Sequence, residues 1–180
     1  DQAFDLSTEA CQRLGWYNRN TAYNPYTIDG KRVAAFEIWE QFGYKAPDSV
    51  WIPVGDGVII SGLAKGFRDL MGLGLIDQMP KLIAVQASGS AALVDALERH
   101  LDEPDPVFGA NSVADSIVVE APRNGILALR DIRYSGGRGV SVSDDEILAA
   151  IATCGQMTGI FVEPSSAAVV AGLIKEREAG

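Results

Sequence analysis

The fold is decided by the stretch Val50-Trp51-Ile52-Pro53-Val54-Gly55-Asp56-Gly57-Val58-Ile59-Ile60-Ser61-Gly62. An apolar run rich in β-branched residues stops at a turn that holds two glycines. Apolar residues then recur at steps of three and four, at Ile59, Leu63, Phe67 and Leu70. These two periods predict a buried strand, a tight glycine turn and the beginning of a helix.

The glycine turn itself has two interpretations. Its backbone N–H groups are not covered by side chains, and the positive end of the helix dipole follows, so the turn is suited to bind a phosphate. The alternative is an ordinary connection between a strand and a helix, which also favours Gly and Asp. Two other predicted strands end on small or polar residues, at Ala87-Ser88-Gly89 and Glu163-Pro164-Ser165. Ligands of parallel sheets bind at these strand ends, which favours the phosphate interpretation.

Strands and helices are predicted to alternate along the whole chain. Besides the strand at 50–54, apolar runs predict strands at 82–86, 116–119, 139–142 and 159–162. Helices are expected at 7–14, 31–42, 59–71, 91–98, 126–134, 143–154 and from 163 onward. This order indicates an α/β fold with three αβα layers and a mostly parallel sheet. We expect one α/β domain over 1–180, in which 1–28 is a partly irregular lead-in or domain-crossing segment.

Composition excludes several classes of protein. The net charge of −9 argues against nucleic acid or an anionic membrane as a partner. No apolar run approaches the roughly 18 to 20 residues of a membrane span, and nothing resembles a signal peptide. The two cysteines, Cys11 and Cys154, have no metal-binding or redox spacing, so we expect a reduced, cytoplasmic protein without a metal site. Because the chain begins at Asp1 without a methionine, we expect it to be a piece of a longer protein.

A series of motifs runs through the chain from about Asn18 onward. They are Asn24-Pro25, Asp29-Gly30-Lys31-Arg32, Pro53-Val54-Gly55-Asp56-Gly57, Leu82-Ile83-Ala84-Val85-Gln86-Ala87, Ser143-Asp144-Asp145-Glu146-Ile147, and Gly159-Ile160-Phe161-Val162-Glu163-Pro164-Ser165-Ser166-Ala167-Ala168. In this order and spacing they resemble the later half of threonine synthase, a pyridoxal-phosphate enzyme of the tryptophan synthase β fold type.

The resemblance implies a pyridoxal-phosphate-dependent lyase of amino-acid metabolism. It would convert O-phosphohomoserine to threonine or catalyse a related β/γ-elimination and replacement on a small amino acid. The residues implied to hold the phosphate are Gly55, Asp56, Gly57, Val58 and Ile59. Ser88 and Gly89 would line the pocket near the cofactor ring, and Glu163 would form a further wall. The resemblance also implies a homodimer.

Two parts of the chain depart from the family pattern. Threonine synthases of this type have a Gly-Asn-Ala-Gly-Asn loop, whereas this chain has Gly-Asp-Gly-Val-Ile. The carboxylate of Asp56 would repel a phosphate unless it turns away. Thr27 stands where the family has an arginine that grips the phosphate of the substrate, and the loss of that clamp argues against a phosphorylated substrate. A serine/threonine dehydratase-like enzyme is therefore the alternative.

No catalytic residue is predicted within the chain. Lys65 follows the glycine turn, but its charged neighbours indicate a solvent-exposed helix face, and Lys31 and Lys175 are also predicted to lie on the surface. The acids Asp144, Asp145 and Glu146 are explained by capping of a helix. The resemblance implies that the Schiff-base lysine lies upstream and that a further ring contact lies beyond the chain. We therefore expect the isolated chain to be inactive.

Two further classes of function stay open. Gly55-x-Gly57 begins the G-x-G-x-x-G fingerprint of a Rossmann nucleotide site, but Ile60 stands in place of its third glycine. The other class is a non-catalytic interaction domain that keeps the sheet without the chemistry.

Overall fold

The computed structural model describes residues 2–179; the two ends of the predicted domain, Asp1 and Gly180, lie outside the described residues. The elements are α1 (Gln2–Leu14), α2 (Pro25–Lys31), α3 (Val33–Gln41), β1 (Ser49–Pro53), α4 (Val58–Gly72), β2 (Lys81–Ala87), the 3₁₀ helix η1 (Ser88–Ser90), α5 (Ala92–Glu98), the 3₁₀ helix η2 (Asp115–Ile117), α6 (Gly125–Tyr134), β3 (Arg138–Val142), α7 (Asp144–Thr158) and α8 (Pro164–Ala179). No helix within this described part has the length and hydropathy needed to cross a membrane.

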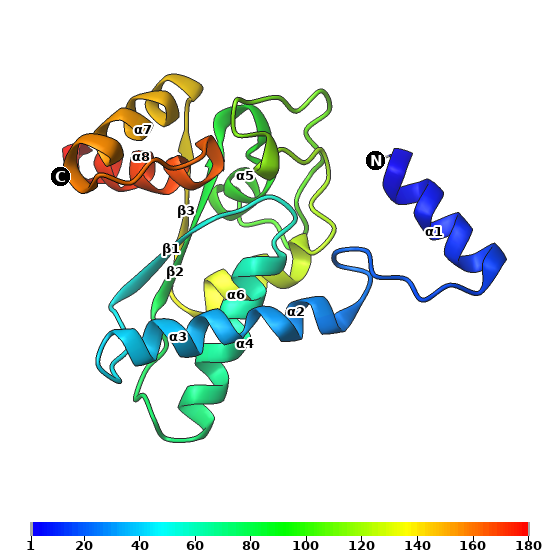
Figure 1. Cartoon of the computed structure of the whole chain (residues 1–180), viewed down its shortest axis with the longest axis horizontal. Helices are drawn as coiled ribbons and strands as arrows, with labels where there is room; N and C mark the ends of the chain where they lie inside the picture. The colour runs from blue at the N-terminus through cyan, green and yellow to red at the C-terminus, as the bar shows by residue number, and fades with distance from the viewer. Residues whose placement is uncertain (1, 180) are drawn as a thin grey trace.

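The sheet has three strands in the order β1-β2-β3, and both pairs are parallel. Helices cover its two faces: α4 and α6 pack on one side, and α7 and α8 lie together on the other (Figure 1). Successive side chains of β2 point to opposite faces of the sheet. Leu82 belongs to the core under α4 and α6, whereas Ile83 belongs to the core under α8. The predicted three-layer α/β fold with a parallel sheet is confirmed.

Helices α2 and α3 lie along α4 because α4 presents glycines to them. A Cβ atom on Gly62 would approach the Cβ of Lys31 to 2.5 Å, and one on Gly66 would approach the carbonyl oxygen of Arg32 to 2.5 Å. Ion pairs flank this contact: Lys65 Nζ lies 2.6 Å from Asp29 Oδ1, and Arg32 Nη1 lies 3.2 Å from Asp69 Oδ2. The close packing fixes α2 beside the first turns of α4.

The strand predicted at 116–119 is wrong. Residues 115–117 form the 3₁₀ helix η2. The backbone of Val119, which follows, is hydrogen-bonded to Ser90 after β2 and not to a strand of the sheet. Ser90 Oγ donates to the carbonyl oxygen of Val119 at 3.0 Å and accepts from Val119 N–H at 2.9 Å. This serine satisfies the backbone groups that a neighbouring strand would otherwise pair with.

The strand predicted at 159–162 is also wrong. Gly159 ends α7 in the left-handed conformation, with φ 73°. Helix α8 begins five residues later at Pro164, and within residues 2–179 the linking segment pairs with no strand of the sheet. Ile160 and Phe161 in this segment are 59% and 85% exposed, respectively.

Helix α2 begins at Pro25, within the lead-in segment 1–28. Asn24 is the N-cap, and its Oδ1 accepts a hydrogen bond from Tyr26 N–H at 3.0 Å. Proline is favoured at the first helical position because its missing N–H would have no helical partner there. Asn24-Pro25 is therefore a helix-start signal that was available in the sequence.

Candidate functional site

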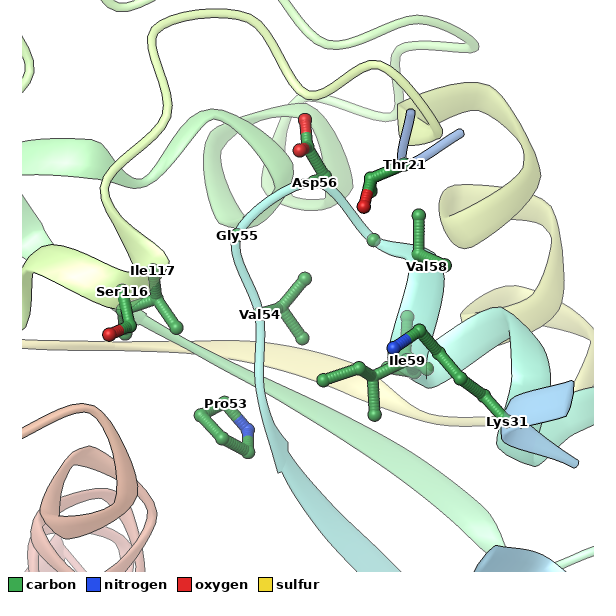
Figure 2. A pocket seen from close by; sticks show the side chains of 12 residues that line it. Thr21, Lys31, Pro53, Val54, Gly55, Asp56, Val58, Ile59, Ser116 and Ile117 are labelled. Atoms are coloured by element: carbon green, nitrogen blue, oxygen red, sulfur yellow. The ribbon is translucent and has the colours of Figure 1, made fainter. Parts of the chain in front are cut away.

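A pocket of about 220 Å³ lies at the carboxyl end of β1 (Figure 2). The stretch 53–60, which contains the glycine turn, forms most of its wall, and residues from three other parts of the chain complete it. The lining residues are Thr21, Lys31, Pro53, Val54, Gly55, Asp56, Gly57, Val58, Ile59, Ile60, Ser116 and Ile117. The structure thus brings together five of the predicted site residues, Gly55 to Ile59, around one cavity.

The backbone geometry of the turn leaves several N–H groups available. The last hydrogen bond between the β1 segment and the backbone of β2 runs from Val54 N–H to the carbonyl oxygen of Val85, at 2.9 Å. Gly57 then adopts the left-handed conformation, with φ 85°, and caps α4 without any side-chain hydrogen bond. The hydrogen bond from Ser61 N–H to Gly57 O spans 3.3 Å. The N–H groups of the preceding first turn have no partner within the helix, as at any helix N-terminus, and they lie along the pocket.

The beginning of α6 holds this turn in place. Asn124 is 9% exposed, and its Nδ2 donates to Gly57 O and to Ser61 Oγ, both at 2.9 Å. Its backbone N–H donates to Asp56 O at 3.0 Å. Ala128 of the same helix leaves no room for a side chain at Gly57, where a Cβ atom would lie 2.7 Å from the Ala128 Cβ. No pattern in the sequence indicates this role of Asn124, because a single sequence does not show which distant segments meet.

The carboxylate of Asp56 does turn away from the pocket. Its Oδ1 accepts from Arg123 N–H at 3.1 Å and lies 3.5 Å from Arg123 Nη1. Figure 2 shows this side chain on the far side of the turn from Val54 and Ile59. The guanidinium compensates the negative charge, so the predicted repulsion of a phosphate is relieved.

Lys31, which was predicted to lie on the surface, differs from that prediction. It is half-buried, lines the pocket, and points its amino group toward Ile59 and Val58 (Figure 2). The charged residues beside it on α2 are engaged elsewhere: Asp29 pairs with Lys65, and Arg32 pairs with Asp69. Within residues 2–179, the ammonium of Lys31 has no hydrogen bond or ion pair.

Three predicted site residues do not line this pocket. Ser88 and Gly89 are exposed in η1, at the end of β2, where a side chain on Gly89 would overlap the carbonyl oxygen of Asn111. Glu163 is exposed just before α8. Next to it, Ser165 is 4% exposed, and its Oγ has no partner among the described residues.

Thr27 also lies outside the lining of the pocket. Its hydroxyl donates to the carbonyl oxygen of Asn24 at 2.6 Å, so it supports the first turn of α2. One helical turn further along α2, on the same side of the helix, stands Lys31. The cationic side chain that α2 presents to the pocket is therefore at 31 and not at 27.

Lys65 lies at the surface, and Glu146 caps a helix, as predicted. Lys65 lies on the outside of α4, where its hydrogen bond lowers the pKa of Asp29 below the ordinary value of 3.8. Ser143 and Glu146 form a capping box at the start of α7: Ser143 Oγ accepts from Glu146 N–H at 3.2 Å, and Glu146 Oε2 accepts from Ser143 N–H at 2.6 Å.

Comparison with known proteins identifies relatives over the full chain. Residues 1–180 match the family described as "Pyridoxal-phosphate dependent enzyme". The threonine synthase of Methanosarcina acetivorans is 40% identical over 175 residues, which cover 97% of this chain and 43% of that protein. The threonine synthase of Methanocaldococcus jannaschii is 36% identical over 180 residues, or 100% of this chain and 44% of that protein. The chain thus spans less than half the length of these relatives.

Solved structures share the fold. Pyridoxal-phosphate-bound threonine synthase from Brucella melitensis superimposes with a TM-score of 0.71 at 20% identity, over 97% of this chain and 42% of that one. Serine racemase from Dictyostelium discoideum gives a TM-score of 0.65 at 25% identity, over 83% of this chain and 44% of that one. The sequence resemblance to threonine synthase is confirmed by the relatives, and these structures bear out the fold type.

Proposed function

The chain belongs to the family of pyridoxal-phosphate-dependent enzymes, and from this premise we propose that its glycine turn binds the phosphate of that cofactor. The observation that carries the proposal is the uncapped N-terminus of α4, which lies along a pocket where the nearby carboxylate of Asp56 is turned away. Main-chain N–H groups and the helix dipole stabilise a phosphate at such a place. The residues proposed to hold it are Gly55, Asp56, Gly57, Val58 and Ile59.

The remaining predicted contacts lie at neighbouring strand ends. Ser88 and Gly89 follow β2, which pairs directly with β1, so they are suited to flank the ring of the cofactor. Glu163 precedes α8, where Ser165 Oγ is buried without a partner among residues 2–179 and has hydrogen-bonding capacity left for a bound group. When bound, pyridoxal phosphate supplies an electron sink, while the protein contributes orientation and electrostatics.

For the full-length protein we propose a lyase activity on a small amino acid, of the threonine synthase type. The 40% and 36% identity to two threonine synthases supports O-phosphohomoserine as the substrate and threonine as the product. Thr27 outside the pocket favours the second candidate, a serine/threonine dehydratase-like activity without a phosphorylated substrate. The homodimer and the cytoplasmic location stay predictions.

We further propose that the lysine that attaches the cofactor lies outside this chain. Lys65 pairs with Asp29 at 2.6 Å and Lys175 Nζ donates to the carbonyl oxygen of Ser141 at 2.8 Å, so both are engaged in structural contacts. The isolated 180 residues are accordingly expected to turn over no substrate. Product formation by this chain alone would contradict this.

The phosphate site is tested with full-length protein and two variants at Ile59. This residue lines the pocket and is 48% exposed. In Ile59→Asp, an acid in the first turn of α4 suits the helix dipole, so the fold is preserved, but the new carboxylate repels a phosphate. Ile59→Asn is the matched neutral control. We expect Ile59→Asp to bind pyridoxal phosphate about tenfold or more weakly than Ile59→Asn, as measured by titration of the visible absorption.

Further measurements test the phosphate site and separate the two candidate activities. Unmodified pyridoxal, which lacks the phosphate, should bind both variants equally. A full-length protein that stays colourless with pyridoxal phosphate would overturn the proposed function. Incubation with O-phosphohomoserine, serine or threonine then separates the activities: threonine and free phosphate indicate threonine synthase, whereas a 2-oxo acid formed from serine or threonine indicates the dehydratase.

A further inference from the structure

We propose that Lys31 is a binding residue of this site and that its ammonium holds a phosphate or a similar anionic group in the pocket. The inference rests on the proposed function in one respect, namely that the anion belongs to the cofactor or to the substrate. Both sources share the same chemistry, a compact anion that accepts charge-assisted hydrogen bonds.

The position of Lys31 is set by helix packing. Gly62 on α4 brings α2 so close that a Cβ atom at 62 would come within 2.5 Å of the Lys31 Cβ. Gly62 stands one turn after the residues that form the pocket wall, so the lysine stem begins beside the N-terminus of α4. From there the side chain reaches the space near Ile59 and Val58 (Figure 2). Its amino group therefore stands on the same side of α4 as the cavity.

Among the residues that the structure describes, no acid forms an ion pair with the ammonium of Lys31. The nearest acid along α2, Asp29, pairs with Lys65 at 2.6 Å and faces Arg32 at 3.6 Å. The acid of the glycine turn, Asp56, is directed to Arg123. A half-buried ammonium next to the positive end of a helix is unfavourable by itself. A bound anion between the two would reverse the sign of this interaction.

The pocket offers a second polar side chain for the same anion. Thr21 lines it from the segment before α2, and Figure 2 shows its hydroxyl near Val58. Thr21 is exposed to solvent, so its hydroxyl is accessible to a ligand in the pocket. The arrangement has main-chain donors on one side and Lys31 on the other, which suits a group with several acceptor oxygens.

The test uses full-length protein with Lys31→Gln, Lys31→Arg and the control Lys45→Gln, an exposed loop lysine outside the pocket. The dissociation constants of pyridoxal phosphate, pyridoxal and inorganic phosphate are measured, together with the KM for O-phosphohomoserine. Lys31→Gln should weaken the binding of one phosphate-bearing ligand by about tenfold or more, the loss expected for a hydrogen bond to a charged group. Lys31→Arg should recover most of it, and Lys45→Gln should match the wild type.

The outcomes identify the source of the anion. A higher dissociation constant for pyridoxal phosphate, with pyridoxal unaffected, assigns the group to the cofactor. An unchanged cofactor affinity with a raised KM assigns it to the substrate. If neither changes, or if borohydride reduction attaches the cofactor to Lys31, the inference is overturned. Should the wild type bind no pyridoxal phosphate, the proposed function fails; a loss of inorganic phosphate binding in Lys31→Gln would still uphold the role of Lys31.

Discussion

Asn124 and Gly57 are 67 residues apart in the chain, yet Asn124 Nδ2 donates to Gly57 O at 2.9 Å. The same amide hydrogen-bonds Ser61 Oγ, so a single buried side chain joins the beginning of α6 to the glycine turn and to the first turn of α4. The main-chain N–H groups of the turn are useful for binding only if they are held in place. Asn124 is therefore a positioning residue for the proposed phosphate site.

Replacing Asn124 by alanine should loosen the turn. The change removes the donor to Ser61 Oγ and one of the two donors to Gly57 O, which still accepts from Ser61 N–H, and we expect a loss of about 1–3 kcal/mol in the free energy of unfolding. Pyridoxal phosphate should bind more weakly while pyridoxal is little affected, which a purely structural role would not produce. Urea unfolding and cofactor titration of full-length protein measure the two effects. Equal weakening for both cofactor forms would contradict the positioning role.

The control for this prediction is Ser61→Ala. It removes one of the two acceptors and leaves the hydrogen bond to Gly57 O, so its effect on cofactor affinity should be smaller. The double variant should lose less stability than the sum of the single ones, because the two residues share one contact.

Local sequence patterns predict those parts of the fold that depend on local physics. The apolar run before Gly55 and the helical spacing from Ile59 to Leu70 become β1 and α4, as expected. The capping box at Ser143 also follows from its sequence. The runs at 116–119 and 159–162 satisfy the same apolar pattern, but a strand needs a partner. Ser90 binds the backbone of Val119, and 159–162 pairs with no strand within residues 2–179.

The site could be predicted only in part for a similar reason. Gly55 to Ile59 are adjacent in the chain, so a motif identifies them. Lys31 and Asn124 come close to the glycine turn only because helices pack together, and this packing cannot be deduced from local sequence patterns. A lysine among charged residues indicates solvent, and only the close contact at Gly62 directs this one to the pocket.

Two glycines of α4 should respond oppositely to alanine. At Gly62 the added methyl group meets Lys31 Cβ at 2.5 Å and the carbonyl oxygen of Ile28 at 3.0 Å, so Gly62→Ala should destabilise the protein by about 1–3 kcal/mol. At Gly72 nothing lies within 4 Å, and Gly72→Ala should stabilise it by about 0.4–1 kcal/mol through the unfolded state. Urea unfolding provides the comparison, and two changes of the same sign would contradict the proposed packing.

The capping box of α7 should give the stability a dependence on pH. The hydrogen bond from Ser143 N–H lowers the pKa of Glu146 below its ordinary value of 4.5. A lowered pKa in the folded state means that the ionised Glu146 stabilises the protein above that ordinary value. The contribution is lost as the pH falls through the folded-state pKa. Unfolding of wild type and Glu146→Gln across this range should show the two curves converge at acid pH.

Two controls accompany this measurement. Glu37→Gln changes an exposed acid on α3 and should leave the difference from wild type nearly constant over the same pH range. Ser143→Ala removes the N-cap acceptor and should lower stability by about 0.5–2 kcal/mol. If Glu146→Gln and Glu37→Gln respond to pH alike, Glu146 has no special role in the cap.

The ion pair between α4 and α6 should be more sensitive to the loss of one partner than of both. Asp131 is 1% exposed, and its Oδ1 lies 2.7 Å from Arg68 Nη1. Arg68→Met strands a buried carboxylate and should lower the free energy of unfolding by about 3–5 kcal/mol, whereas Arg68→Met with Asp131→Leu should regain most of it. Arg99→Met breaks the exposed pair with Asp95 and should change stability by less than about 1 kcal/mol. Asn124, which holds the glycine turn, lies at the beginning of α6, so the affinity for the cofactor should follow the same order as the stability. A double variant as unstable as Arg68→Met would refute the unpaired buried charge as the cause.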